Sequence, residues 1–437
     1  MNDTVSATKV SLIAVAGQAI TYGFAILMAR KLGVDGFDHF VLAAAAFIVM
    51  VTFVSGGYDK YSLRILPALV AHGRGWAVRR YLRFAVRRTL GIATAIAMLL
   101  VGCVWFVGAF SPDLRWALLF SGLALPAGAL VHLGLEVLTA MGLPVYAALI
   151  FRILVPGTAM IVFCMGIEVA AESSAALGTA AWTVGWVAGA GVMLAMHWRW
   201  SPAGSAHASA EHASVQDALV HPASMGSDEA LWKSEARPFW IYRLSMAALA
   251  QAGIFGVNAF QSSPTAVGAY AAALGTAGLA QVLATATNRV FARRLSLLLE
   301  REDFEMIERF RRRRLLWLSA PLTIYLIATL FFARDLLAFF RPEFVEEGVA
   351  ALRILSCATA FIVLFALSPT YLKFRRLNQL IYVNVGAAAV LHILLLVMLV
   401  PRWGPTGAAV SYAVAMVGMY GNMARLARRE FTAMRTP

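Results

Sequence analysis

The chain has 437 residues, of which 60% are hydrophobic and 14% are charged, and its formal net charge is +14. A soluble globular chain has about a quarter of its residues charged, so this composition excludes an ordinary soluble domain and indicates a polytopic membrane protein. The three cysteines lie in separate apolar runs, which excludes a CxxC metal or redox motif.

Twelve apolar runs follow one another along the chain, and each is close to the roughly 20 residues that a helix needs to cross a bilayer. The first set lies at 10–29, 37–61, 84–110, 115–139, 144–167 and 174–198. The second set lies at 238–260, 265–290, 315–340, 348–371, 378–400 and 406–424. We therefore expect an all-α fold of about 12 transmembrane helices.

One long polar stretch, rich in Ala, Ser, His and Gly, separates the two sets of runs and is typical of a linker. Related short segments open the second and eighth runs, and others open the sixth and twelfth runs, which indicates an internal repeat of the kind common in transporters. The expected organisation is an N-terminal six-helix lobe at 1–198, a polar cytoplasmic linker at 199–237 and a C-terminal six-helix lobe at 238–437.

The basic residues predict the orientation. With the N-terminus in the cytoplasm, the cytoplasmic segments hold 27 Lys and Arg residues and the opposite side holds six. This bias follows the positive-inside rule and places both termini in the cytoplasm. The positive net charge is thus explained by topology, and no nucleic-acid partner is expected. A cleaved signal peptide is also not expected, because the first apolar run continues past the usual length without a cleavage motif.

No P-loop, H-E-x-x-H or G-x-S-x-G motif occurs in the sequence, which favours a transporter over an ATP-driven pump or a membrane enzyme. The predicted outer loops are very short and leave no room for an external catalytic domain. No metal site and no organic cofactor are expected.

Charged residues end the second run, in the stretch 56–64. On a continuous helix Lys60 and Arg64 share one face and are candidates to bind a phosphate group. A second interpretation is that both side chains snorkel to the membrane interface, as basic side chains ordinarily do. The length of the run favours that second interpretation for Arg64, and both interpretations stay open for Lys60 and Asp59. The repeat places a second basic helix end, containing Arg289, Arg293 and Arg294, opposite this stretch. The two helix ends together predict an electropositive vestibule, and Arg289 is the deepest of the three arginines. The competing explanation for these arginines is the positive-inside rule.

Two ionisable residues of the fourth run, His132 and Glu136, are four positions apart and share a helix face. Together with Asp59 they are the candidates for coupling to H⁺ or Na⁺, and Arg152 of the fifth run is the candidate counter-charge for Glu136. A structural pair within the bundle is the alternative. Further along, residues 296–314 form a basic amphipathic pattern that predicts a helix on the anionic inner leaflet.

Four segments in chain order resemble motifs of the polysaccharide flippases, which belong to the multidrug/oligosaccharidyl-lipid/polysaccharide exporter superfamily. The segment 29–37 (Ala-Arg-Lys-Leu-Gly-Val-Asp-Gly-Phe) resembles the entry to span two. The segments 267–270 and 351–355 continue the match, and 399–409 (Leu-Val-Pro-Arg-Trp-Gly-Pro-Thr-Gly-Ala-Ala) resembles the junction of spans eleven and twelve. One departure is Asp38, where that family usually has a second glycine.

The resemblance implies a V-shaped, MATE-like pair of pseudo-symmetric lobes in a bacterial inner membrane. It implies transport of an undecaprenyl-pyrophosphate-linked oligosaccharide by alternating access through a cationic cavity, in surface polysaccharide biosynthesis. The expected partners are this substrate, membrane lipids and a polysaccharide polymerase or export machinery. Three alternatives stay open: a cation-coupled multidrug exporter of the same fold, a flippase for a peptidoglycan precursor, and a membrane glycosyltransferase or polymerase.

Overall fold

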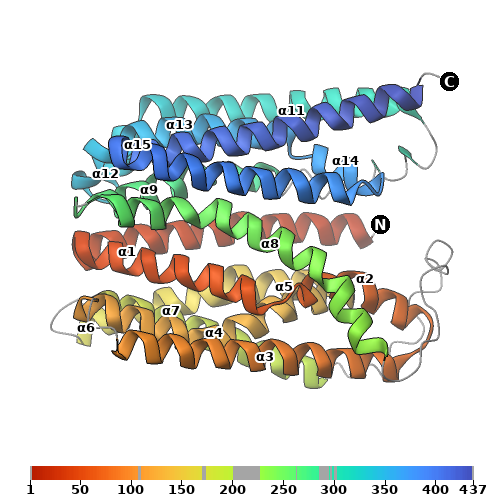
Figure 1. Ribbon diagram of the computed structural model, residues 1–437, viewed down its shortest axis with the longest axis horizontal. Coiled ribbons are helices and arrows are strands. Elements are labelled where there is room, and N and C mark those ends of the chain that lie inside the picture. Colours follow the sequence, from red (N-terminus) through yellow and green to blue (C-terminus); the bar gives the residue numbers. More distant parts are fainter. Residues whose placement is uncertain are drawn as a thin grey trace. The chain divides into compact units, whose positions relative to one another are not determined.

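The structure is a computed structural model that describes residues 2–106, 110–169, 174–199, 227–261, 263–284 and 303–435, together with Leu295, Leu298 and Leu299. Within these residues it is all-helical, as the sequence predicts (Figure 1). The chain divides into two compact units, unit 1 (Met1–Leu42 and Ser245–Pro437) and unit 2 (Ala43–Leu244). These bounds group the first crossing with the second half of the chain, whereas the lobes predicted from the repeat divide at the linker.

Unit 2 contains the end of α1 (Asn2–Val54), the first part of α8 (Ser227–Phe260) and the helices between them. These are α2 (Tyr58–Ala71), α3 (Gly75–Phe106), α4 (Pro112–Ala140), α5 (Pro144–Leu149), a π-helical turn (Ile150–Leu154), α6 (Val155–Val169) and α7 (Ala175–Arg199). Helix α4 is central and packs against α2, α3, α5 and α7. Its Asp113 accepts hydrogen bonds from the backbone amides of Ala175 and Ala176, both at 3.2 Å, and so caps α7.

Unit 1 contains the start of α1 and the remaining helices. These are the rest of α8, α9 (Ala266–Gly278), α11 (Phe304–Phe331), α12 (Ala333–Ala338), a 3₁₀ turn (Pro342–Phe344), α13 (Val345–Phe365), α14 (Ser368–Phe374) and α15 (Asn378–Arg435). Helix α13 packs against α9, α11 and α15.

Helices α1 and α15 each fold back on themselves at a glycine. Gly33 (φ 78°) and Gly404 (φ 52°) have backbone conformations that interrupt the two helices. The Phe24 and Phe40 rings lie 6.2 Å apart, whereas 16 residues of straight helix would separate them by about 24 Å. Each helix therefore supplies two antiparallel apolar segments, as the separate runs at 10–29 and 37–61, and at 378–400 and 406–424, predict (Figure 1).

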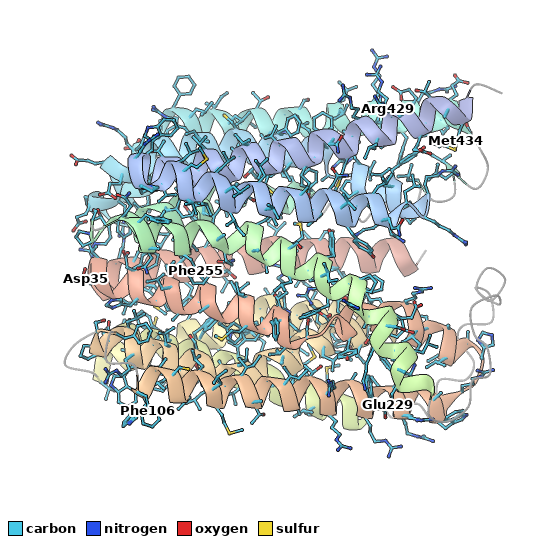
Figure 2. All side chains as sticks on the ribbon, viewed as in Figure 1. Asp35, Phe106, Glu229, Phe255, Arg429 and Met434 are labelled. Carbon is cyan, nitrogen blue, oxygen red and sulfur yellow. The ribbon has the colours of Figure 1, made fainter. Side chains whose placement is uncertain are left out.

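Among the described residues, nine helices are long and apolar enough to cross a membrane. They account for every predicted run except 238–260, which lies in α8 and stays a prediction. Large apolar side chains project from the helices, and Phe106 is 87% exposed at the end of α3 (Figure 2). Exposed apolar surface on this scale is expected where lipid is the solvent, and the protein is a multi-pass membrane protein.

Candidate functional site

The charged stretch 56–64 does not continue the preceding helix. Helix α1 ends at Val54, Gly56 and Gly57 have positive φ angles of 55° and 77°, and α2 begins at Tyr58. The prediction of one unbroken segment at 37–61 is therefore wrong at its end. Lys60 and Arg64 still lie one turn apart, in α2. The glycines separate a short, charged helix from the apolar crossing before it.

Helix α8 packs directly on this break. A side-chain carbon on Gly57 would collide with the backbone of Ala236 and lie 2.7 Å from the Trp240 backbone nitrogen. The Trp240 indole donates a hydrogen bond to the Phe53 carbonyl at 2.9 Å, in addition to the one that this carbonyl accepts from the Gly56 amide. The start of α8, which includes part of the polar stretch predicted as a linker, is thus a helix fixed to the α1–α2 junction.

Asp59 is buried, with 1% of its side chain exposed, and it forms an ion pair with Arg243 of α8. The Lys60 backbone amide donates to the Asp59 carboxylate at 2.8 Å. An ion pair and a hydrogen bond together offset the cost of burying this charge. Arg243 has no distinguishing signal in the sequence, because it looks like one more basic residue near a predicted membrane surface.

The two basic residues of α2 are also paired. Lys60 forms an ion pair with Glu136 of α4 while 39% of its own side chain stays exposed. Arg64 donates to Glu235 of α8 at 2.9 Å, and both side chains are partly exposed. Residues of the charged stretch 56–64 therefore form three ion pairs, which join α2 to α4 and α8.

His132 lies one turn before Glu136 on α4, in an aromatic setting. Its ring stacks on Trp186 at 5.6 Å and meets the edge of Phe151 at 5.3 Å. Arg152 lies in the π-helical turn, with its guanidinium 5.3 Å from the Phe151 ring. The structure thus gives Glu136 the partner Lys60, and a pairing of Glu136 with Arg152 stays a prediction. Arg289, Arg293 and Arg294 lie outside the described residues.

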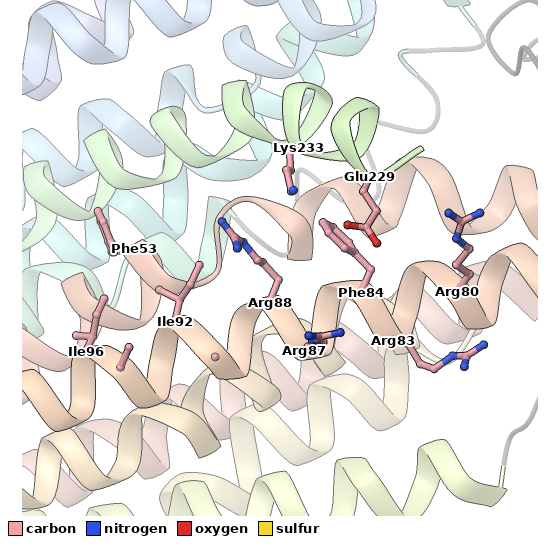
Figure 3. A pocket seen from close by; sticks show the side chains of 12 residues that line it. Phe53, Arg80, Arg83, Phe84, Arg87, Arg88, Ile92, Ile96, Glu229 and Lys233 are labelled. Carbon is pink, nitrogen blue, oxygen red and sulfur yellow. The ribbon is translucent and has the colours of Figure 1, made fainter. Parts of the chain in front are cut away.

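A pocket of about 990 Å³ lies beside these ion pairs, between α3 and the start of α8. Arg80, Arg83, Arg87 and Arg88 follow one another along α3, and α8 contributes Lys233 and Glu229 (Figure 3). The sequence assigns these arginines to membrane orientation alone. Their gathering on one wall depends on where α8 packs, which no local pattern reveals.

Two buried charges in unit 1 have structural roles that the sequence analysis missed. Asp38, the departure from the family motif, is buried beside the first turn of α9, near the amides of Val267 and Gly268. Arg314 is buried and donates to the carbonyls of Val363 and Leu364 at the end of α13, at 3.1 and 2.9 Å. The basic pattern at 296–314, predicted to lie on the membrane surface, therefore ends in an inward-facing arginine.

Comparisons with known proteins show solved structures that share the fold of this chain. No protein-family model and no curated protein matches the chain. A solved structure of a multidrug resistance MATE family transporter of the MOP superfamily, in an inward-facing conformation, matches with a TM-score of 0.69 and 12% identity, over 97% of this chain and 99% of that chain. The lipid II flippase MurJ, in an inward closed conformation, matches with a TM-score of 0.66 and 11% identity, over 97% and 89%.

A third match is a MOP superfamily transporter from Pyrococcus furiosus, described as having a binding pocket of reverse polarity. It matches with a TM-score of 0.61 and 13% identity, over 99% of this chain and 96% of that chain. At these identities the likeness is one of fold. The chain shares the fold of these three solved structures.

Proposed function

We propose that the protein is a flippase that moves an undecaprenyl-pyrophosphate-linked oligosaccharide from the cytoplasmic to the periplasmic leaflet of a bacterial inner membrane. It acts by alternating access and serves surface polysaccharide biosynthesis, without enzymatic chemistry of its own. The fold supports this proposal, because it is shared with a protein described as a lipid II flippase as well as with MATE transporters. Membrane lipids and a polysaccharide polymerase or export machinery are the proposed partners.

The observation that carries the proposal is the charge balance of unit 2. Asp59, Glu136 and Glu235 each neutralise one cation of the chain itself. The neighbouring pocket then adds five basic side chains against one carboxylate, Glu229. Such a surplus attracts a polyanion, and a lipid pyrophosphate is one.

Lys60 is the proposed point of exchange between the protein and the substrate. It is paired with the buried Glu136 yet 39% exposed itself, so an arriving phosphate can reach its ammonium group from the open side. Arg64 is proposed to assist from the next turn of α2. Arg289, Arg293 and Arg294 are proposed to supply the opposing cations from the second half of the chain.

The alternative function is a cation-coupled exporter of multidrug or small-molecule substrates. It would couple H⁺ or Na⁺ through Asp59 or Glu136, with His132 and Arg152 beside them. Both carboxylates are held by cations of the chain, Arg243 and Lys60, and this engagement favours the flippase. Coupling through Glu136 is the form of the alternative that an experiment can separate.

The proposal is tested with the double variant Lys60→Ala/Arg289→Ala in a bacterium that depends on this chain for its surface polysaccharide. We expect the polysaccharide to be lost while the protein reaches the membrane in normal amount, because the pyrophosphate loses cations from both halves of the chain. The control is Arg79→Ala/Arg312→Ala, which removes two exposed arginines elsewhere. Unchanged polysaccharide in the test variant would contradict the cation role.

Glu136→Gln separates the two functions in the same assay. Reduced export that no longer responds to a proton ionophore would favour coupling through this residue. A fully active Glu136→Gln protein would remove Glu136 from any coupling role and leave the Lys60 result to decide the flippase proposal.

A further inference from the structure

The pocket between α3 and α8 has two chemically different ends. On α3 its four arginines lie at positions 80–88, with Phe84 among them, and its residues at 91–96 are all uncharged. Spacings of three and four keep these positions on one face of the helix, so the wall changes from cationic to apolar along a single stripe. The cationic part spans about 12 Å along the helix axis, and the apolar part continues from it.

The cationic end is built for phosphate. Arg80, Arg83, Arg87 and Arg88 present planar guanidinium groups, which bind phosphate oxygens in pairs. Lys233 adds a fifth cation from α8 and lies 5.8 Å above the Phe84 ring. Among the described residues that line the pocket Glu229 is the single carboxylate, so the cationic end carries a clear excess of positive charge.

The apolar end is open and suits a hydrocarbon chain. Ile92 and Ile96 line it from α3, and the half-exposed Phe53 lines it from the end of α1 (Figure 3). Nothing lies within 4 Å of the place where a side chain on Gly91 would begin. This glycine leaves the middle of the stripe free for a ligand that reaches from one end to the other.

The predicted topology gives the stripe a direction. The basic residues lie at the predicted cytoplasmic end of α3, and the apolar residues follow toward the middle of the crossing. A membrane lipid has the same order, with the phosphate at the surface and the chain in the bilayer. Basic pockets between helices on the cytoplasmic side are typical sites for anionic lipid head groups.

We propose that this pocket binds the phosphate of a lipid, with α3 arginines on the phosphate oxygens and the lipid chain along Ile92, Ile96 and Phe53. The ligand class is a phosphate or pyrophosphate ester on a long apolar chain. Two sources carry that chemistry, an anionic phospholipid of the bilayer and a polyprenyl pyrophosphate. The site stands on the chemistry of the pocket and does not depend on the transported glycan.

The test is a binding measurement on the purified full-length protein in a neutral detergent. The probes are farnesyl pyrophosphate, dioctanoyl phosphatidylglycerol and, as a zwitterionic control, dioctanoyl phosphatidylcholine. We expect one or both anionic probes to bind, and Arg83→Ala/Arg87→Ala to weaken that binding about tenfold through the loss of charge-assisted hydrogen bonds. Arg79→Ala, which removes an arginine of the same helix from outside the pocket, should leave the affinity unchanged.

A second variant tests the apolar end. Gly91→Phe puts a ring into the open middle of the stripe, and replacing a glycine within a helix does not weaken the helix itself. We expect it to reduce lipid binding with all arginines in place. An unaltered affinity in either pocket variant, an equal loss in Arg79→Ala, or equal binding of phosphatidylcholine would overturn the proposal.

The two anionic probes distinguish the sources of the ligand. Tighter binding of farnesyl pyrophosphate supports a site for the polyprenyl carrier, and tighter binding of phosphatidylglycerol supports a site for bilayer phospholipid. In the second case the pocket is a lipid site even if the flippase proposal fails. Thermal unfolding of each variant shows whether a lost affinity comes from a lost fold.

Discussion

Asp59 is a buried carboxylate whose charge needs compensation from neighbouring groups. A carboxylate with 1% exposure is costly unless a cation and hydrogen bonds replace its water, and Arg243 and the Lys60 amide do so. The Arg64–Glu235 pair uses the same two helices, α2 and α8, but lies in the open. The two pairs differ mainly in burial, which makes them a natural comparison.

We predict that Arg243→Met lowers the free energy of unfolding by about 3–5 kcal/mol, because it leaves the Asp59 charge buried and unpaired. The matched change Arg64→Met should cost at most about 1 kcal/mol, as expected for an exposed pair. Denaturant unfolding of the purified protein in detergent measures both. The double variant Asp59→Leu/Arg243→Met should recover much of the loss. Equal effects of the two single variants would contradict the role assigned to burial.

The sequence singles out Asp59, Lys60 and Glu136 because ionisable residues near apolar runs are conspicuous. The sequence does not indicate the partners of these residues. Arg243 lies far along the chain from Asp59, and nothing in its neighbourhood distinguishes it from other basic residues. Which cation meets which carboxylate depends on the packing of α8 on the α1–α2 junction, and that packing follows from the tertiary structure alone.

The contact between α2 and α8 depends on a glycine. Gly57 starts α2 in the left-handed region, and the backbone of α8 passes so close that no side chain fits. Gly73, just after α2, has a similar φ of 66°, but nothing lies within 4 Å of where its side chain would begin. The two glycines share a positive φ and differ in how closely another helix approaches.

We predict that Gly73→Ala costs about 1–2 kcal/mol of stability, the usual penalty for a left-handed L-residue. Gly57→Ala should cost clearly more, because the added methyl group also pushes α8 away from α1 and α2. This displacement weakens the Trp240–Phe53 hydrogen bond and the Asp59–Arg243 ion pair. Thermal unfolding gives the stabilities of the two variants. If the two alanine variants were equally stable, close packing of α8 at Gly57 would be ruled out.

The start of α8 also shows where composition misleads. The polar stretch 199–237 predicts a linker, yet from Ser227 the chain is helical. Trp232 is buried there, with its ring 5.3 Å from both Tyr81 and Phe84. A few aromatic contacts with α3 thus decide the local structure over a weak propensity. Arg314 gives the same lesson, because the carbonyls that it caps belong to a helix 50 residues further on.

At the level of the whole chain the sequence is a better guide. In lipid every backbone polar group must be satisfied within its own segment, so apolar length alone predicts helices and their number. The reversals at Gly33 and Gly404 are predicted for the same reason, since a single apolar helix of that length would greatly exceed the bilayer. The fold is likewise shared with solved transporters at 11–13% identity, because it depends on this pattern rather than on particular residues.

The orientation in the membrane decides which leaflet the proposed lipid site faces. Cys103, Cys164 and Cys357 are exposed, so each is first replaced by Ala. A membrane-impermeant maleimide should then label Arg402→Cys in spheroplasts, and should label Arg79→Cys only after the membrane is opened, because basic segments stay in the cytoplasm.

Labelling of Arg79→Cys in intact spheroplasts would place the pocket arginines on the periplasmic side. A lipid-linked sugar made in the cytoplasm could not then meet them before it is transported. The pocket could still hold a lipid in that orientation, but as a site reached after transport or as a site for bilayer phospholipid. The topology experiment therefore decides whether the cationic end of α3 faces the leaflet from which the proposed substrate comes.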